Sequence, residues 1–159
     1  MQLISDKQQE GVDLDFKTKA DASTGEVGRD DKKNLAKVLS AFSNSMGGLI
    51  VWGVDARKNV DNIDCATELK PITGIERFQS EVVRLISQAI MPRHDEIIVQ
   101  CVKSSAPDTG YLLLYVERSE RRPHRSEIDK QYYRRSGDSS TAMEHFDIED
   151  SFKRFVVPS

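Results

Sequence analysis

Apolar and polar residues alternate along some stretches of this chain and recur at helical spacing along others. Residues 12–17 alternate, which predicts a strand with three apolar side chains on one face and Asp15 and Lys17 on the other. Residues 48–55 are apolar on both faces, which predicts a central strand that Asp55 closes. The two strands flank a helical segment, so we expect them to pair in parallel.

Apolar residues spaced three and four apart predict two main helices. The first begins at a capping Asp30 or Asp31 and ends near Met46, before two glycines. The second covers about residues 75–90 and ends before a proline. The expected buried stripes are Leu35, Val38, Leu39, Phe42 and Met46 in the first helix, and Ile75, Phe78, Val82, Leu85, Ile86 and Ala89 in the second.

The remaining segments predict a single α+β domain covering residues 1–159. It has a mixed sheet of five to six strands, two main helices and a short C-terminal helix. The other expected elements are loops at 18–29 and 118–125, a polar connection at 56–74, strands at 96–103, 111–117 and 130–135, a turn at 137–141 and a helix at 147–155.

Composition narrows the class of protein. Hydrophobic residues make up 38% and charged residues 31% of 159 residues, and no apolar run approaches the roughly 18 residues of a membrane span. The first residues lack the apolar segment of a signal peptide. Cys65 and Cys101 show no ligand spacing, so we expect reduced thiols in a cytoplasmic protein.

The net charge of −3 conceals an asymmetry along the chain. Residues 1–31 carry eight acids and four bases, whereas residues 118–135 carry seven bases and three acids. The net negative charge of the whole chain argues against a general electrostatic attraction to nucleic acid. The basic segment nevertheless predicts a local phosphate-binding surface. A solvated loop and strand edge is the alternative interpretation of the same segment.

Three acids and one lysine suggest a metal-dependent phosphodiesterase. Asp15 and Lys17 share a strand face, Glu10 precedes them and Asp55 follows the central strand. Carboxylates hold hard divalent cations, and an ammonium group can position water or phosphate. The alternative is an ordinary exposed strand face, with Asp55 starting a turn.

The order of motifs resembles the Schlafen Alba-like (AlbA_2) domain. That family shows a glutamate followed by Glu-Phe-Lys, a helix ending in Ala-Phe-Ala-Asn-Thr-x-Gly-Gly, an Ile-x-x-Gly-Val-Asp strand and a Tyr-x-Arg-x-Gly-Ser-Ser ending. The matching residues here are Glu10, Asp15-Phe16-Lys17, Ala41 to Gly48, Ile50 to Asp55, Arg122-Pro123 and Tyr132 to Thr141. The motif-bearing core covers about residues 10–141.

The resemblance implies nucleic-acid binding and, as in vertebrate Schlafens, metal-dependent endoribonuclease activity on tRNA-like RNA. The implied ligands of Mg²⁺ or Mn²⁺ are Glu10, Asp15 and Asp55, and Lys17 joins them as a catalytic residue. Asp15 departs from the family, whose active enzymes carry glutamate there, and its side chain is about one methylene shorter. Vertebrate relatives clasp RNA with two lobes, so we expect this single lobe to form a homodimer.

The expected nucleic-acid contacts are Arg118, Arg121, Arg122, Arg125, Tyr132, Arg134 and Arg135. One of Tyr132 and Tyr133 must face inward if this segment is a strand. Asn44 is expected to buttress the helix end, the alternative being a nucleotide cradle. His94, His124 and His145 are expected to be surface residues.

Two other functions stay open. One is a non-catalytic DNA-binding domain of a transcriptional regulator. The other is a nucleotide (ATP)-binding or protein-interaction module, although the chain lacks the phosphate-binding loop motif of ATP hydrolysis.

Overall fold

The computed structural model describes residues 13–58 and 64–155, and its centre is a five-stranded mixed sheet. The strands are β1 (Leu14–Lys17), β2 (Gly48–Trp52), β5 (Ile72–Thr73), β7 (Ile97–Lys103) and β8 (Thr109–Val116). β1 pairs with β2 in parallel, and the other pairs are antiparallel. This confirms the predicted α+β class and the predicted parallel pair.

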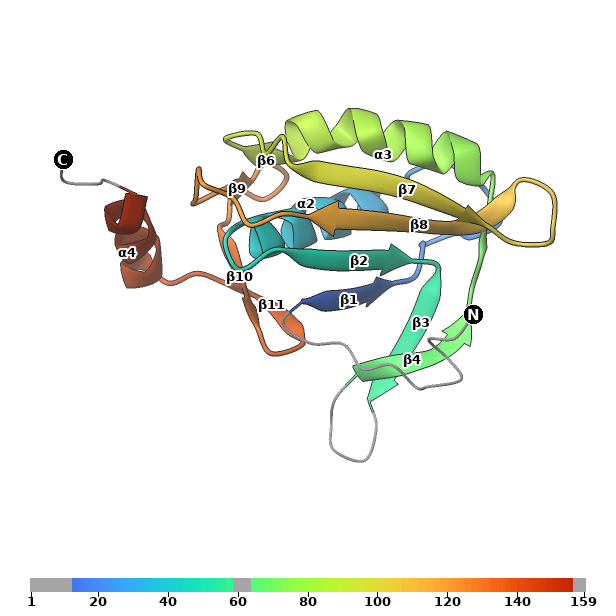
Figure 1. Cartoon of the computed structure of the whole chain (residues 1–159), viewed down its shortest axis with the longest axis horizontal. Helices are drawn as coiled ribbons and strands as arrows, with labels where there is room; N and C mark the ends of the chain where they lie inside the picture. The colour runs from blue at the N-terminus through green and yellow to red at the C-terminus, as the bar shows by residue number, and fades with distance from the viewer. Residues whose placement is uncertain (1–12, 59–63, 156–159) are drawn as a thin grey trace.

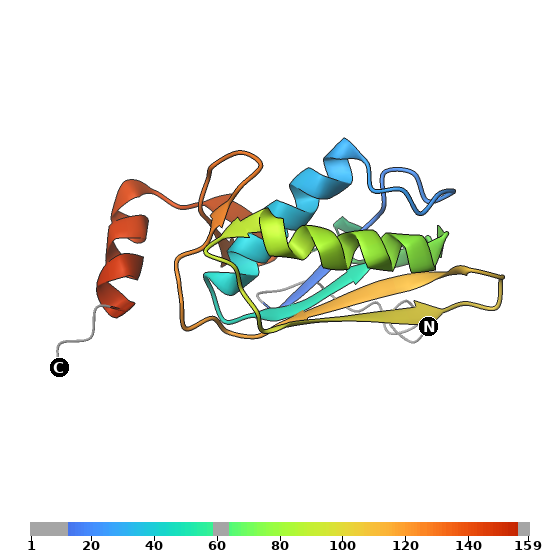
Figure 2. The ribbon, with the colours of Figure 1, turned by 90° about the horizontal axis from the view of Figure 1, so that it is seen from above.

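Two helices, α2 (Arg29–Ser43) and α3 (Ile75–Ala89), cover one face of this sheet (Figures 1 and 2). Their apolar stripes bury against the side chains that β2 and β8 turn toward them. Trp52 lies at the centre, edge-on to Phe78 with ring centroids 5.5 Å apart. The main core includes Leu35, Val38, Leu39, Phe42, Ile50, Trp52, Ile75, Phe78, Val82, Leu112 and Leu114.

A second, smaller core lies on the opposite face of the sheet. It consists of Phe16, Val51, Val54, Ala66 and Tyr111. The hairpin of β3 (Val54–Lys58) and β4 (Asp64–Leu69) contributes two of these residues.

The predicted strand at 48–55 and the polar connection at 56–74 were wrong in detail. The chain bends at Gly53, whose φ of +110° favours glycine. A Cβ at this position would also lie 2.8 Å from the Tyr111 ring. Asp55 therefore belongs to β3 instead of closing β2, and residues 56–74 contain β4 and β5.

The ends of α2 also differ from the prediction. Gly28 occupies the N-cap. Its backbone N–H donates at 3.1 Å to the carboxylate of Asp31, which is the third residue of the helix. The helix ends at Ser43 with Asn44 as C-cap. Met46 lies beyond that end and is 65% exposed, so it does not continue the buried stripe.

The C-terminal third builds small sheets beside the helices. β6 (Ile90–Met91) pairs with β9 (Arg125–Ser126), and β10 (Tyr133–Ser136) pairs with β11 (Ser139–Ala142). The predicted strand at 130–135 and turn at 137–141 are in fact one hairpin. α4 (His145–Phe155) lies at one end of the molecule (Figure 1) and contacts the β10–β11 region through the Arg134–Asp147 ion pair at 3.7 Å. Among the described residues, no helix is long and apolar enough to cross a membrane.

Candidate functional site

Asp15 and Lys17 lie on the helix-covered side of β1, as the alternating pattern predicts. Asp15 pairs in register with Ile50, a main-core residue, whereas Phe16 points into the smaller core. The Asp15 side chain is buried, at 4% exposure, and its Oδ2 lies 3.1 Å from Nζ of Lys17. A buried carboxylate of this kind needs a cationic partner.

Arg135 of β10 is the second partner of Asp15. Its Nη1 donates to Oδ1 of Asp15 and to Oγ of Ser140, both at 3.1 Å, and its Nη2 donates to the Leu14 carbonyl at 3.2 Å. The guanidinium also lies 4.9 Å from the centre of the Phe42 ring. Arg135 is thus a buried residue whose guanidinium group bonds to Asp15, Ser140 and Leu14.

A cavity of about 350 Å³ borders this ion pair. Asp15, Lys17, Asp55 and Arg135 all line it. The bend at Gly53 matters here, because it carries Asp55 away from β2 into β3. Three of the four predicted catalytic residues therefore meet at one cavity.

Glu10, the fourth predicted catalytic residue, lies outside the described residues. Within residues 13–58 and 64–155, no group of three or more acids, histidines or cysteines is arranged to hold a metal ion.

Sequence reasoning missed several polar residues of this cavity. Asn34 and Lys37 of α2 line it, together with Ser140 of β11. The signal in the sequence was weak: Asn34 and Lys37 are three apart on a helix and so share one side of it. Ser140 becomes recognisable only when the hairpin brings it to Arg135.

A second cavity, of about 280 Å³, adjoins the first. Arg122, Arg134 and Arg135 line it, together with Asp147 and Asp150 of α4. Arg135 lines both cavities, so the carboxylates and the arginine-rich surface are neighbours.

The other predicted nucleic-acid contacts are more dispersed. Arg118 and Arg121 are exposed and line a third cavity of about 220 Å³. Arg125 lies 3.0 Å from a carboxylate oxygen of Glu127.

Of the two neighbouring tyrosines, Tyr133 is buried. Tyr132 is half-buried and edge-on to Phe152, with ring centroids 6.5 Å apart. This confirms that one tyrosine faces inward.

The prediction of surface histidines was wrong for His94 and His124. Both are buried, and their rings stack with centroids 5.4 Å apart. His124 Nδ1 donates to the Pro92 carbonyl, so its Nε2 accepts from the Ser119 hydroxyl. Burial lowers the pKa of His124 to about 4, and it lowers the pKa of His94 as well.

Asn44 holds the end of α2 against this histidine, which confirms its structural interpretation. Its Nδ2 donates to the carbonyls of His124 and Tyr133, both at 2.8 Å. Its Oδ1 accepts the His124 backbone N–H. One side chain thereby fixes β9 and β10 beside the cavities.

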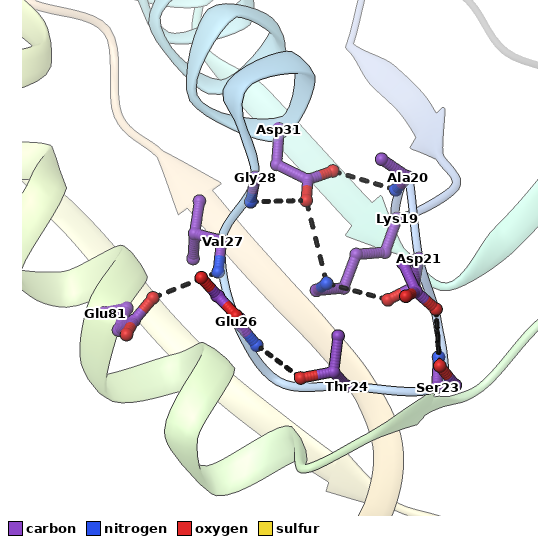
Figure 3. Close-up of polar contacts among 10 residues, drawn as sticks. All are labelled: Lys19, Ala20, Asp21, Ser23, Thr24, Glu26, Val27, Gly28, Asp31 and Glu81. Atoms are coloured by element: carbon purple, nitrogen blue, oxygen red, sulfur yellow. Dashed lines mark hydrogen bonds and ion pairs between the residues drawn. The ribbon is translucent and has the colours of Figure 1, made fainter.

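A separate buried ion pair joins the loop after β1 to α2 (Figure 3). Lys19 Nζ lies 3.7 Å from Oδ2 of Asp31 and donates to the Asp21 carbonyl at 2.7 Å. Asp31 also accepts the backbone N–H groups of Ala20 and Gly28. Neither Lys19 nor Asp31 lines any of the three cavities described above.

Comparisons with solved structures show a shared fold. The DIP2311 protein of Corynebacterium diphtheriae is 17% identical with a TM-score of 0.58, and the match covers 89% of this chain and 24% of that one. The N-terminal domain of a RecG-related protein of Nitrosomonas europaea is 17% identical with a TM-score of 0.56, covering 91% of this chain and 94% of that domain.

This chain thus spans about a quarter of the C. diphtheriae protein. The comparison with curated proteins returned no match. The family model named "Schlafen, AlbA_2" matches residues 10–144, which include every element from β1 to β11. Since the match covers most of the chain, this protein belongs to the Schlafen AlbA_2 family.

Proposed function

We propose that this chain binds nucleic acid and hydrolyses phosphodiester bonds in structured, tRNA-like RNA with the help of a divalent cation. One observation carries the proposal: Arg135 lines both the cavity with Asp15, Lys17 and Asp55 and the cavity with Arg122 and Arg134. A backbone held by the arginines would therefore pass beside the carboxylates. Membership of a nucleic-acid-related family supports the same proposal.

The residues of the first cavity fit a hard cation. Asp15 Oδ2 is buried and, apart from its 3.1 Å ion pair with Lys17, accepts no hydrogen bond from the described part of the chain. Asp55 supplies carboxylate oxygens to the same cavity, and oxygen ligands are those that Mg²⁺ and Mn²⁺ prefer. We propose Asp15 and Asp55, together with Glu10, as the ligands. Such a cation, when bound, polarises a phosphoryl oxygen and acidifies a bound water.

The remaining roles belong to cationic side chains. Lys17 is partly exposed to the cavity, so its ammonium group can hold the scissile phosphate or orient the attacking water. Arg135 orients Asp15 through the buried ion pair. Arg122 and Arg134 bind backbone phosphates, which predicts affinity that falls steeply with salt.

The decisive experiment compares cleavage of labelled tRNA and duplex DNA with Mg²⁺, Mn²⁺ or EDTA. We expect RNA cleavage only with a cation, and a loss of at least about 100-fold in Asp55→Asn and Glu10→Gln. Glu68→Gln is the matched control for Asp55→Asn, because Glu68 lies opposite Asp55 on β4. The control should cleave at the wild-type rate.

The same experiment can overturn the proposal. Cleavage that survives in both acid variants would show that other groups catalyse it. Tight binding to intact RNA or DNA, with or without a cation, would remove catalysis and leave a binding module.

A non-catalytic DNA-binding module is the second candidate. Asp15 is already engaged by two cations, Arg135 and Lys17, which is what a purely structural carboxylate requires. The N. europaea protein is named as related to RecG, a DNA helicase, which supports DNA as the partner in this case. Binding of duplex DNA over tRNA without cleavage is its expected result.

Two further predictions remain part of this proposal. The reduced thiol of Cys101 fits the cytoplasmic location proposed from the sequence. The proposed homodimer needs a surface that leaves both cavities accessible.

A further inference from the structure

The outer edge of β7 combines open backbone groups with exposed apolar side chains. β7 is seven residues long and pairs only with β8 among the described strands. In Figure 2 it lies at the rim of the sheet, on the side of the molecule away from β1. We propose that this edge pairs antiparallel with β7 of a second copy of this chain, which joins two five-stranded sheets into one.

The hydrogen-bond pattern identifies the open groups. Glu96 accepts from the Glu117 N–H and the Ser104 N–H donates to Thr109, so even-numbered residues of β7 face β8. The N–H and C=O groups of the odd-numbered residues 97–103 therefore point away from the sheet. Within residues 13–58 and 64–155, no backbone group outside β7 and β8 bonds them.

The side chains along this edge are self-complementary. Ile98 and Val102, 62% and 37% exposed, lie symmetrically about Gln100 on the open face of the sheet. With Gln100 facing Gln100 of the second copy, each Ile98 lies opposite a Val102. These are non-hydrogen-bonded pairs, in which cross-strand side chains approach most closely.

The flank of α3 adds apolar surface on the other side of the edge. Glu76 of α3 reaches Lys103 of β7 at 2.7 Å, so this flank overhangs the strand. Val83 is seven residues further along the same helical side and is 52% exposed. The Glu76 contact also neutralises Lys103, the one charged residue within β7. Proteins normally protect exposed edges with charges, prolines or bulges, and the described β7 has no proline or bulge.

The partner is a second copy because the register matches itself about a two-fold axis. The inference gives the homodimer of the proposed function an interface, but it does not depend on the proposed catalysis, since β1 and its cavity lie at the opposite edge of the sheet. A dimer built in this way leaves both cavities accessible.

The first test measures mass by sedimentation equilibrium of the full chain from about 1 to 200 μM, within the range of specific dimers. We expect a dimer in the wild type and at least a 10-fold higher Kd in Ile98→Lys/Val102→Lys. The control is Ile128→Lys/Phe146→Lys, which changes two exposed apolar residues elsewhere, at 54% and 69% exposure, and should leave the dimer intact. An 18.0 kDa monomer throughout, or a dimer unaffected by the β7 variant, would overturn the proposal.

The second test fixes the register. With Cys65 and Cys101 replaced by serine, Gln100→Cys places two thiols opposite one another, with Cα atoms about 4.5 Å apart, within disulfide range. Val102→Cys is the matched control, because its two copies lie four residues out of register. We expect at least 10-fold more cross-linked dimer with Gln100→Cys. Equal cross-linking of the two variants would reject this pairing.

Discussion

Two buried carboxylates, Asp15 and Asp31, meet cations in contrasting settings. Asp31 pairs with Lys19, twelve residues earlier, and also accepts two backbone N–H groups (Figure 3). Asp15 pairs with Arg135, 120 residues away, and among the described residues its Oδ2 is held only by the ammonium group of Lys17. Only Asp15 borders one of the cavities that we propose to function in binding.

The two sites differ in what they contribute: the Asp31 pair contributes to stability, and the Asp15 site is the one suited to bind a ligand. The Lys19–Asp31 pair has its oxygens occupied by the backbone, so it stabilises the loop before α2 and offers little to a ligand. At the Asp15 site, one carboxylate oxygen is held only by the partly exposed ammonium group of Lys17, beside a cavity. Buried charge by itself therefore does not indicate a functional site, whereas a buried carboxylate oxygen held only by a partly exposed cation beside a cavity does.

Lys19→Met should have the largest effect on the free energy of unfolding. The change leaves Asp31 charged, buried and without its cation, which costs about 3–5 kcal/mol. Urea denaturation measures the loss, with exposed Lys33→Met as control, expected within about 0.5 kcal/mol of wild type. RNA binding by the folded variant should be unchanged. A loss below about 1 kcal/mol would mean that the backbone donors alone hold Asp31.

Acid should destabilise the protein through His124. This histidine belongs to neither ion pair, so its effect on stability is separate from theirs. The folded-state pKa of about 4 lies below the ordinary 6.5, so below pH 6.5 the unfolded chain binds a proton that the folded chain refuses. Stability is therefore complete above pH 6.5 and decreases by about 3 kcal/mol as the pH falls to 4.

Comparing urea denaturation of wild type and His124→Gln across this range isolates the contribution of His124. The free energy of unfolding of this variant should fall less than that of wild type as the pH decreases. His145→Gln, which alters an exposed ring, should follow wild type. His94 and the nearby Arg121 and Arg122 act in the same direction on the His124 pKa. Parallel curves for wild type and His124→Gln would contradict the assignment.

Asp15→Asn should cost less stability than Lys19→Met. The amide oxygen can still accept from Arg135, and Arg135 keeps its bonds to Leu14 and Ser140. We expect a loss of about 2 kcal/mol, in the range of a hydrogen bond to a charged group. Cation-dependent cleavage should fall at least about 100-fold, measured where the variant is fully folded. Unchanged cleavage would make Asp15 purely structural, like Asp31.

The sequence predicted well what depends on neighbouring residues. The alternation at 12–17 put Asp15 and Lys17 on one face, and helical spacing found α2 and α3. The predicted cap at Asp30 or Asp31 was close but wrong, because Gly28 is the N-cap and Asp31 is the third residue of α2.

What the sequence could not show was contact between distant segments. Arg135 resembled a surface arginine until β10 packed against α2 and brought it to Asp15. His124 resembled a surface histidine because Asn44, Pro92 and Ser119, which enclose it, come from separate segments. The positive φ at Gly53, which moved Asp55 into β3, had no local signal beyond the glycine itself.

Lys17→Met should have the smallest effect on stability and is the sharpest test of the contrast. It makes the same chemical change as Lys19→Met two residues earlier, at a side chain 26% exposed instead of 1%. Asp15 keeps Arg135, so the expected loss is below about 1 kcal/mol, as for a partly exposed ion pair. Cleavage should nevertheless fall at least about 10-fold, because the ammonium group faces the cavity. If Lys17→Met and Lys19→Met lose stability equally and cleave equally well, the two carboxylates play the same structural role.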